Sequence, residues 1–327
     1  MTKNILITGG SGFIGSHLTR KLLSLGYKVA ITTKYKSIID NIRIIDLWSK
    51  IKVIETDLRN LDSFNNLKSF KPDVVFHLAA YNHVGDSFSS FSESNSSNAI
   101  STYNLLNYFQ GKIDQFIYIS TSEIYGNQKK VFKEDLLPNP ISPYSISKYS
   151  GELYVRMLMN ETNYPAKIIR PFNAYGEYQS SKAIIPEIIT NCLNNKDIIT
   201  TEGYQTREFN YVGNLVDGFI AVMKSKKMFN KTVNIGSGKD ISVRNLVKII
   251  HTLTKSKSKI KFGALKPRVT EIYKMRADNK LVKEYTGWKP KVNFNEGLIR
   301  TIKWYEKFNK IYMSKKSDLY KLSDDLT

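Results

Sequence analysis

Cysteine and histidine are scarce in this sequence, and long hydrophobic runs are lacking. The 327 residues include one cysteine, Cys192, which excludes an intrachain disulfide framework and favours a reducing compartment, so we expect a cytoplasmic protein. The four histidines are scattered, and no spacing of cysteine and histidine indicates a metal site. No apolar run approaches the length of a membrane span, and we expect neither a membrane anchor nor a signal peptide.

Acidic residues are also few in comparison with basic ones. The 29 Asp and Glu residues stand against 49 Lys and Arg, which gives a formal net charge of +20. An excess of basic residues is also typical of nucleic-acid-binding proteins, which is a second functional hypothesis. Such proteins cluster their basic residues on one face or in one tail. Here the lysines are spread along the chain, and the densest stretch, residues 255–261, has no interleaved aromatic residues. We therefore expect a solvated basic surface and no nucleic-acid partner.

The N-terminus has the pattern of a phosphate-binding unit. Residues 3–8 read as a short buried strand, residues 9–15 are glycine-rich, and the helical pattern of residues 16–25 follows. Glycines allow a tight turn and close approach to a pyrophosphate, and the helix N-terminus supplies N–H groups and the positive end of a dipole. This strand–turn–helix context predicts a dinucleotide site. The residues assigned to it are Gly9, Gly12, Phe13, Ile14 and Gly15.

The second predicted strand ends without an acidic residue. NAD-binding sites usually place Asp or Glu there, where the carboxylate accepts hydrogen bonds from the adenosine ribose. This chain has Lys34 and Lys36 instead, which can pair with a 2′-phosphate. The sequence therefore favours NADP over NAD, with a merely basic surface as the alternative.

Strands and helices alternate along most of the chain. This alternation predicts an α/β fold, a doubly wound parallel (Rossmann) sheet whose ligands lie at the carboxyl ends of the strands. The predicted strands are 29–32, 52–55, 74–77, 115–119, 166–170 and 232–235, and the predicted helices are 16–25, 61–70, 98–109, 144–160, 184–194, 215–225 and 243–254. We expect a dinucleotide-binding domain over 1–171, to which part of 207–236 returns, a smaller, mainly substrate-binding C-terminal lobe over 172–310, and a polar tail over 311–327.

Tyr144 and Lys148 stand one helical turn apart, on the same face of a predicted helix. An ammonium beside a phenol favours the phenolate, so Tyr144 is predicted to be a base near neutral pH. Thr121, Ser122 and Glu123 follow the fifth strand of the sheet. Glu123 adds an acid or base that simple alcohol oxidation does not need; an exposed acid at a strand end is the alternative.

These motifs and others resemble the extended short-chain dehydrogenases/reductases that act on nucleotide sugars, along almost the whole chain. The resemblance is carried by residues 8–15, 57–58, 77–80, 120–126, 144–148, 170–176, 205–212, 234–238 and 287–288. It implies a nucleotide-diphosphate sugar as substrate and a homodimer formed by the helices of Asn98 and Tyr144, packed as a four-helix bundle. The further cofactor contacts it implies are Asp57, Leu58, Leu78, Ala79, Ala80, Asn98, Tyr144 and Lys148.

Four residues are predicted to bind the substrate. Asn173 resembles the family's pyrophosphate-contacting asparagine, and the guanidinium groups of Arg207 and Arg268 suit bidentate pyrophosphate binding. His83 is the fourth, with the orientation of its loop as the alternative role. For both arginines the alternative is a structural salt bridge. For the cofactor contact Asn98 the alternative is a helix N-cap.

Within that family, Thr-Ser-Glu at 121–123 resembles the GDP-mannose 4,6-dehydratases and also the UDP-glucuronate decarboxylases. Residues 82–88 resemble the dehydratases, and residues 170–211 resemble a UDP-N-acetylglucosamine 4,6-dehydratase-like group. The chain lacks the His-x-Ser-Pro-Arg-Arg stretch of the GDP-mannose enzymes. We expect a 4,6-dehydratase, a lyase, with a 4-epimerase or a decarboxylase as alternatives.

The dehydratase hypothesis assigns a role to each catalytic residue. Tyr144 removes the C4 hydroxyl proton, Thr121 holds that oxygen, and Lys148 supports the phenolate and bonds the nicotinamide ribose. Glu123 takes the C5 proton that the C4 ketone has acidified, and the C6 hydroxyl leaves as water. Hydride returns to C6, which gives a 4-keto-6-deoxy sugar. Ser122 polarises the substrate or lines the site.

Overall fold

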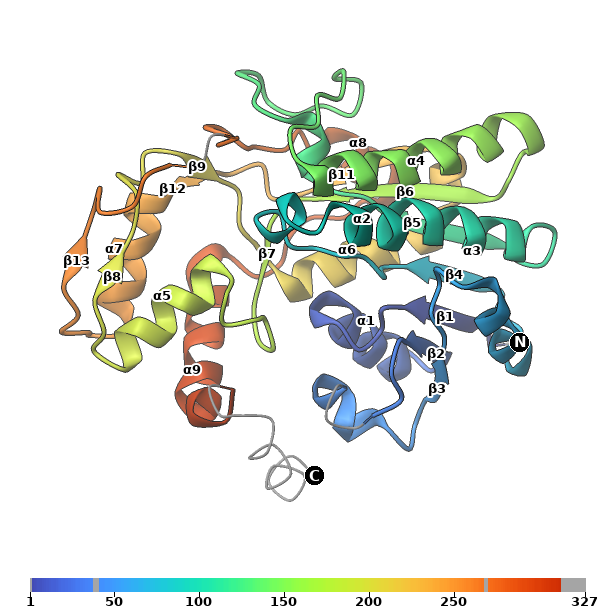
Figure 1. Cartoon of the computed structure of the whole chain (residues 1–327), viewed down its shortest axis with the longest axis horizontal. Helices are drawn as coiled ribbons and strands as arrows, with labels where there is room; N and C mark the ends of the chain where they lie inside the picture. Colours follow the sequence, from blue (N-terminus) through green and yellow to red (C-terminus); the bar gives the residue numbers. More distant parts are fainter. Residues whose placement is uncertain (1, 38–40, 268–269, 313–327) are drawn as a thin grey trace.

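The computed structural model describes residues 2–37, 41–267 and 270–312. Its centre is a seven-stranded, all-parallel sheet in the order β11-β6-β5-β4-β1-β2-β3 (Figure 1). The strands are β1 (Asn4–Thr8), β2 (Lys28–Thr33), β3 (Lys52–Glu55), β4 (Val74–His77), β5 (Gln115–Ile119), β6 (Ala166–Pro171) and β11 (Thr232–Ile235). The order reverses between β1 and β4, and in such sheets ligands bind at the carboxyl ends of the strands beside that point. The predicted doubly wound α/β fold is confirmed.

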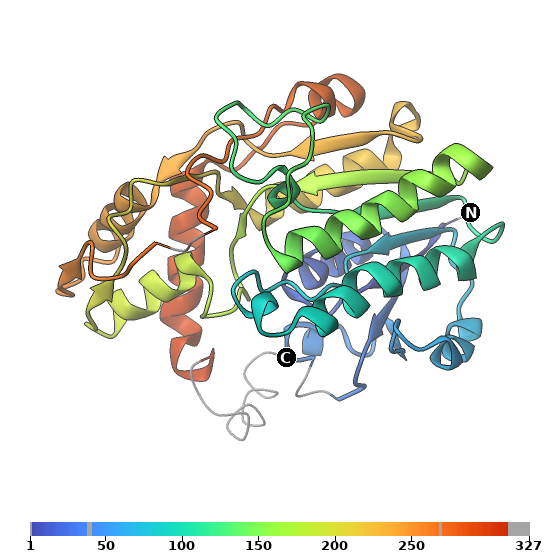
Figure 2. The ribbon, with the colours of Figure 1, turned by 45° about the horizontal axis from the view of Figure 1, so that its top comes forward.

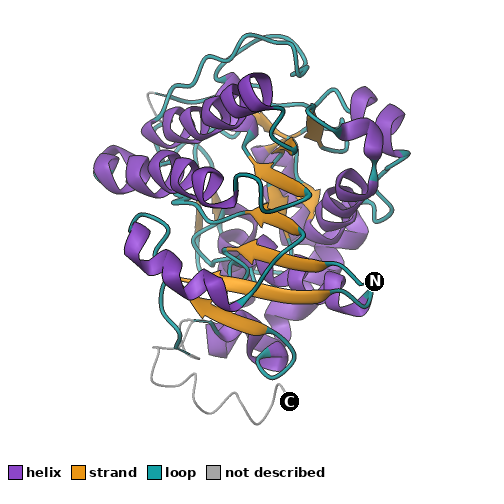
Figure 3. Cartoon of the chain, turned by 90° about the vertical axis from the view of Figure 1, so that its right-hand side faces the viewer, coloured by secondary structure: helices purple, strands orange, loops and turns teal. Residues whose placement is uncertain are grey.

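Alternation along the strands sends successive side chains into two cores. In β1, Ile5 and Ile7 pack in a cluster with Leu18, whereas Leu6 packs in a second cluster with Leu105 and Val155. Because both faces are buried, the strands are continuously apolar. Helices α1 (Phe13–Ser24) and α6 (Val212–Lys224) cover one face, and α3 (Ser101–Phe109) and α4 (Pro143–Thr162) cover the other (Figure 3).

The long helix α4 has clear start and stop signals. The Ser142 hydroxyl accepts a hydrogen bond from the backbone N–H of Ser145, whose hydroxyl accepts one from the N–H of Ser142, and Pro143 occupies the first turn. The helix ends at Asn163, which adopts the left-handed conformation. These caps fix where the helix begins, and so they fix the positions of Tyr144 and Lys148.

Beyond β6, smaller elements lie beside the carboxyl ends of the strands (Figures 1 and 2). The helices there are α5 (Ile184–Leu193), α7 (Val243–Leu253) and α9 (Phe294–Tyr312), whereas α8 (Lys280–Thr286) packs against α6 and β11 of the main sheet. The short strands are β7 (Ala174–Tyr175), β8 (Ile198–Ile199), β9 (Thr206–Arg207), β10 (Asn210–Tyr211), β12 (Ile241–Ser242) and β13 (Ile260–Lys261). Between them the chain returns to the main sheet through α6 and β11.

Three predicted segments differ from the structure in detail. The predicted helix over 61–70 is the 3-10 helix η2 (Leu61–Ser69). The helix predicted to open at Asn98 begins earlier, as α2 (Phe91–Asn95) followed by the π-helical η4 (Ser96–Ile100), and α3 then continues it. The described residues contain four further short helices, η1 (Ile42–Leu47), η3 (Asp86–Phe88), η5 (Ser122–Tyr125) and η6 (Lys226–Met228). Helix α9 extends to Tyr312, and residues 313–327 of the predicted tail lie outside the described residues.

Candidate active site

A cavity of about 1040 Å³ opens at the carboxyl ends of the strands and extends toward α5 and β8. It brings together most of the residues that the sequence analysis assigned to a site. Those that line it are Gly9, Gly12, Phe13, Ile14, Gly15, Lys34, Asp57, Leu58, Leu78, Ala79, Ala80, Thr121, Ser122, Glu123, Tyr144, Lys148, Asn173 and Arg207. His83 and Asn98 are not among its lining residues, and Arg268 lies outside the described part of the chain.

The glycine turn forms the first wall of the cavity. Gly9 has a positive φ of 68°, and the Gly12 N–H donates to the Gly9 carbonyl at 3.0 Å. A side chain at Gly15 would overlap that same carbonyl oxygen. Helix α1 follows with no acidic residue in its first turn, so its N-terminal N–H groups face the cavity without a competing carboxylate. This narrow cradle fits the pyrophosphate of a dinucleotide.

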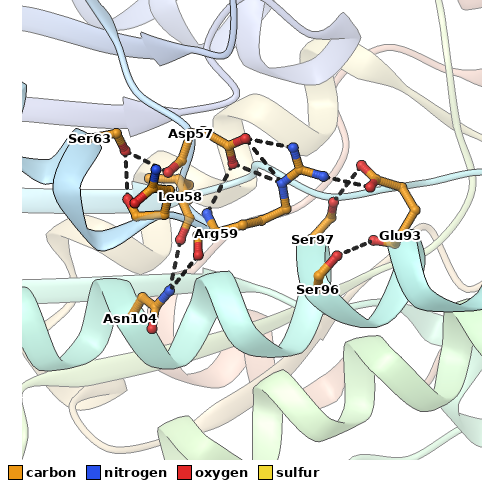
Figure 4. Close-up of polar contacts among 9 residues, drawn as sticks. Asp57, Leu58, Arg59, Ser63, Glu93, Ser96, Ser97 and Asn104 are labelled. Carbon is orange, nitrogen blue, oxygen red and sulfur yellow. Dashed lines mark hydrogen bonds and ion pairs between the residues drawn. The ribbon is translucent and has the colours of Figure 1, made fainter.

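At the end of the cavity beside β2 and β3, an ionic network surrounds Arg59 (Figure 4). The Arg59 guanidinium donates to both Asp57 carboxylate oxygens, at 2.8 and 2.6 Å, and to Glu93 on α2 at 2.5 Å. Hydrogen bonding from Arg59 lowers the pKa of Asp57 below its usual value, and the charge of Lys34 acts in the same direction. The sequence analysis assigned Asp57 but missed Arg59 and Glu93. The one signal in the sequence for the pairing of Arg59 with Asp57 is their separation of two residues.

Thr121, Glu123 and Tyr144 meet beside the end of β5. Thr121 caps the 3-10 helix η5 (Ser122–Tyr125) by accepting from the Glu123 backbone N–H at 3.2 Å, and its hydroxyl also hydrogen-bonds the Tyr144 phenol. Burial raises the pKa of Tyr144 to about 12, the Thr121 hydrogen bond opposes this rise, and the negative charge of Glu123 adds to it. The expected lowering of the Tyr144 pKa toward neutrality is therefore wrong for this arrangement, because desolvation dominates.

Lys148 lies below Tyr144 on the same helix and is 2% exposed. Its ammonium donates to the Ile119 carbonyl at 2.6 Å and sits 4.5 Å from the centre of the Tyr118 ring. Burial lowers the pKa of Lys148 to about 7, and the negative charge of Glu152 opposes this fall. The lysine is thus held at the floor of the cavity in an environment that makes its charge costly.

The far end of the cavity contains Asn173 and Arg207. Arg207 is ion-paired with Glu271 and also donates to the Ile272 carbonyl, so the salt-bridge alternative describes its present contacts. The Asn173 amide donates to the Met275 sulfur at 3.3 Å, and so does the Ser122 hydroxyl at 3.6 Å. The sequence analysis missed Met275, which no motif indicates.

Two residues predicted to contact a ligand do not line the cavity. His83 is exposed, and the nearest ionic partner recorded for its ring is Asp86, at 3.9 Å. Asn98 is buried, but its amide accepts from the Tyr81 backbone N–H at 2.7 Å and donates to the Tyr81 carbonyl and the Ser147 hydroxyl. It therefore fixes the backbone after β4, and being inside the π-helical segment it is not an N-cap either.

Two kinds of feature are absent from the described residues. No cluster of three or more His, Cys, Asp or Glu side chains that could hold a metal ion occurs in residues 2–37, 41–267 and 270–312. Within the same ranges, no helix combines the length and apolar character needed to cross a membrane.

Comparison with known proteins establishes the family. A family model described as "NAD dependent epimerase/dehydratase family" matches residues 5–236. The chain belongs to this family. The expected membership in the extended short-chain dehydrogenases/reductases is thereby confirmed.

The relatives of this family member carry out different reactions. The chain is 33% identical to a putative UDP-glucose 4-epimerase of Methanocaldococcus jannaschii, over 94% of this chain and 99% of the relative. It is 32% identical to the human dTDP-D-glucose 4,6-dehydratase, over 93% of this chain and 90% of the relative. A crystal structure of the UDP-glucuronic acid 4-epimerase from Bacillus cereus, in complex with UDP-glucuronic acid and NAD, has a TM-score of 0.86 at 30% identity and covers 93% of this chain and 99% of that chain.

Proposed function

We propose that this family member is a nucleotide-sugar 4,6-dehydratase that forms a 4-keto-6-deoxy sugar. The observation that carries the proposal is the position of Glu123, which lines the same cavity as Thr121 and Tyr144 and lies close enough for its charge to act on the phenol. An oxidation at C4 needs the tyrosine alone. A carboxylate beside it supplies the second proton transfer that an elimination requires.

The residues of the cavity then have distinct tasks. Tyr144 takes the C4 hydroxyl proton, while Thr121 holds that oxygen and Lys148 supplies a positive charge below the phenol. Glu123 removes the C5 proton once C4 is a ketone, because the ketone stabilises the carbanion as an enolate. When bound, a nicotinamide cofactor supplies the acceptor for the C4 hydride and the donor for the return to C6. The C6 hydroxyl leaves as water.

The cavity also suggests how the two ligands divide its length. We assign the cofactor to the part formed by residues 1–171 and the returning segment within 207–236, and the sugar nucleotide mainly to 172–310. Arg207 would reach a pyrophosphate only by sharing or leaving Glu271, and Asn173 only by leaving Met275. Ser122 is assigned to the wall of the site, since its hydroxyl is directed to Met275.

A 4-epimerase is the second candidate, favoured by the reaction named for the Methanocaldococcus relative. It would use Tyr144 and Lys148 in the same oxidation and rotate the ketone, leaving C5 and C6 unchanged. A decarboxylase would lose carbon dioxide from a C4-keto uronic acid. Of the three reactions, only the dehydratase needs a base for the C5 proton, and so it gives Glu123 this task, although the decarboxylases share the Thr-Ser-Glu motif.

Product mass after incubation with a panel of nucleotide sugars tests the proposal. Loss of water indicates a dehydratase, loss of carbon dioxide a decarboxylase, and unchanged mass with altered stereochemistry an epimerase. Glu123→Gln should lose at least about a hundredfold in elimination while C4 oxidation persists. The matched control is Glu161→Gln, an exposed acid on α4 far along the helix, which should leave turnover unchanged. Full elimination by Glu123→Gln would exclude the proposed role.

We propose further that NADP is preferred over NAD. The wall of the cavity at the end of β2 has Thr33 and Lys34 rather than an acid, and Asp57 is neutralised by Arg59. Lys34→Glu should weaken NADP binding at least about tenfold more than NAD binding, since a 2′-phosphate carries the extra charge. Lys36→Glu, which is exposed and outside the lining, is the control. Wild-type binding of NAD that equals or exceeds that of NADP contradicts the proposal.

A homodimer through α3 and α4 is supported by apolar side chains on their outer surface. Ile146, Leu153 and Met157 form a stripe on α4, and Ile100 and Tyr103 extend it at the start of α3. The two helices lie side by side (Figure 2), so two copies can pack as a four-helix bundle.

Light scattering on the purified protein tests the dimer. Leu153→Glu should shift the mass from dimer to monomer, because a buried unpaired carboxylate opposes association. Leu137→Glu places the same charge at an exposed leucine away from these helices and should leave the mass unchanged. A monomeric wild-type protein would refute the assembly.

A further inference from the structure

A buried acid continues the row of residues that begins at Tyr144. Tyr144, Lys148 and Glu152 follow one another at four-residue spacing in α4, so they share one face of the helix. Glu152 is fully buried, although isolated carboxylates are rarely found inside proteins. The reaction scheme above gives it no task, and no sequence motif singled it out.

The Glu152 carboxylate is saturated with hydrogen bonds. Ser120 donates to Oε2 at 2.6 Å, and Arg170 donates to both oxygens, at 3.2 and 2.6 Å. Arg156 donates to Oε1 through two nitrogens, each at 2.9 Å. Such a set of partners holds the acid ionised, and it lowers the pKa of Glu152 in spite of burial.

The end of β5 ties this acid to the lysine. Lys148 donates to the carbonyl of Ile119, and the next residue, Ser120, donates to Glu152. The residue after that is Thr121, which hydrogen-bonds the Tyr144 phenol. Three consecutive residues therefore fix the three members of the helical row, so a shift of any one of them is opposed by both the strand and the helix.

The charges around Lys148 leave Glu152 as its counterion. On β4, His77 is fully buried between Thr8 and Thr102, and burial lowers its pKa to about 3, so it is neutral. The lysine faces the Tyr118 ring of β5. On its own helix, its neighbours one turn away are Tyr144 and Glu152. The Glu152 carboxylate is in turn paired with the cations of Arg170 and Arg156. Glu123 acts on Tyr144 from η5 but is not among the groups that act on Lys148.

We propose that Glu152 is a positioning residue for the proposed oxidation, which holds Lys148 as a fixed cation below Tyr144. This inference rests on the proposed function only for its first proton transfer, which a dehydratase, an epimerase and a decarboxylase would share. Lys148 stands between Tyr144 and Glu152 on one face of α4, so the inference routes the influence of Glu152 on the base through the lysine. The paired Arg170 keeps the acid in place.

The pH dependence of C4 oxidation tests this role. The measured quantity is the rate of reduced nicotinamide formation in a single turnover, for wild type, Glu152→Gln, Glu152→Asp and Arg156→Gln. In Glu152→Gln the lysine loses its counterion and therefore stabilises the Tyr144 phenolate less. The ascending limb of the pH–rate profile should then move about one pH unit upward, so the rate at a pH below the limb should fall roughly tenfold. Glu152→Asp keeps the charge and should restore the wild-type limb.

Arg156→Gln supplies a shift of opposite sign. Arg156 is partly exposed and competes for the same carboxylate, so its removal leaves more of the Glu152 charge for Lys148 and should move the limb downward. A merely structural role would lower the rate at every pH in both variants without moving the limb. That result would refute the inference. If Glu152→Gln fails to fold, Arg156→Gln alone decides, and an unshifted limb in that variant would refute the inference as well.

Tyrosinate absorbance gives a readout that needs no turnover. The difference between each protein and its Tyr144→Phe version, recorded with bound cofactor from pH 8 to pH 12, isolates the ionisation of Tyr144, because the other tyrosines are common to both proteins. The ionisation should move upward in Glu152→Gln. If wild type oxidises no nucleotide sugar, the proposed function fails while this titration still decides the part played by Glu152.

Discussion

At Gly151, α4 passes close to β5 and η4, and replacing this glycine should separate activity from stability. A methyl group there would lie 2.5 Å from the buried Tyr118 hydroxyl and 2.9 Å from the Asn98 carbonyl. Carbon and oxygen cannot approach so closely, so α4 must move away from β5 and η4. Lys148 lies one turn earlier, and its backbone carbonyl accepts a hydrogen bond from the Tyr118 hydroxyl at 2.8 Å.

The magnitude follows from two opposing effects on the Gly151→Ala variant. Overpacking costs about 1–3 kcal/mol, and alanine recovers about 1 kcal/mol of helix propensity, which leaves a net loss of roughly 0–2 kcal/mol. At about 2–4 °C per kcal/mol for a large domain, Tm should fall by less than about 8 °C. A displacement of the reacting groups by about 1 Å, however, costs up to a hundredfold in rate.

Single-turnover oxidation and thermal unfolding measure the two quantities on the same protein. We expect the single-turnover rate constant of oxidation to fall by about ten- to a hundredfold while the protein stays folded and cooperative at the assay temperature. Ser150→Ala, on the preceding residue, removes a hydroxyl that bonds only the Ile146 carbonyl of its own helix and should change both quantities little. A wild-type rate constant in Gly151→Ala would show that α4 tolerates the displacement and would refute the reasoning.

Three further predictions concern the cofactor end and pH. Gly15→Ala should abolish dinucleotide binding, measured by calorimetry, because its methyl group meets the Gly9 carbonyl; retained affinity contradicts the assigned cradle. Arg59→Gln should weaken cofactor binding by about tenfold, whereas Glu93→Gln, which leaves the Asp57 pair intact, should change it less. His77 has a folded pKa of about 3, below its unfolded value, so its contribution to stability is complete above about pH 6.5 and is lost as pH falls toward 3. Urea unfolding should therefore show a loss of about 1.4 kcal/mol per pH unit between pH 6 and 4, and His77→Asn should flatten that slope.

The sheet was predictable because its information is local. Each strand from β1 to β6 is a short apolar run, and the glycine turn after β1 sets the direction of the first crossover. The segment around Asn98 was harder to predict, since a π-helical turn inserts one residue per turn into an otherwise regular pattern. Residues 61–69 form a 3-10 helix. Over so few turns, its pattern of polar and apolar residues is the same as that of a short α-helix, so the sequence could not distinguish the two. Patterns of this kind predict that a helix exists more reliably than they predict its winding.

The candidate site was predictable in its members but less so in their partners. Motif spacing placed Tyr144, Lys148 and Glu123 in one cavity. The pKa of Tyr144 was misjudged, because burial depends on how much of the chain packs around the phenol and a two-residue motif does not contain that quantity. The pairing of Arg207 with Glu271 joins positions 64 residues apart, and nothing local indicates it.

The Arg59 network at the cavity wall and the Glu152–Arg170 network behind it differ in a way that matters for the proposed reaction. The Arg59 network is partly exposed, and surface ion pairs contribute only about 0–1 kcal/mol each, so its bonds can rearrange around different adenosine groups. The Glu152–Arg170 pair is buried, and removing one partner of such a pair costs about 3–5 kcal/mol. Under the proposed function, a rigidly held base and a more adjustable cofactor end suit a common oxidation followed by different later steps. Variation between relatives should therefore concentrate at the position of Glu123, which follows the rigid part, and not at Lys148 or Glu152.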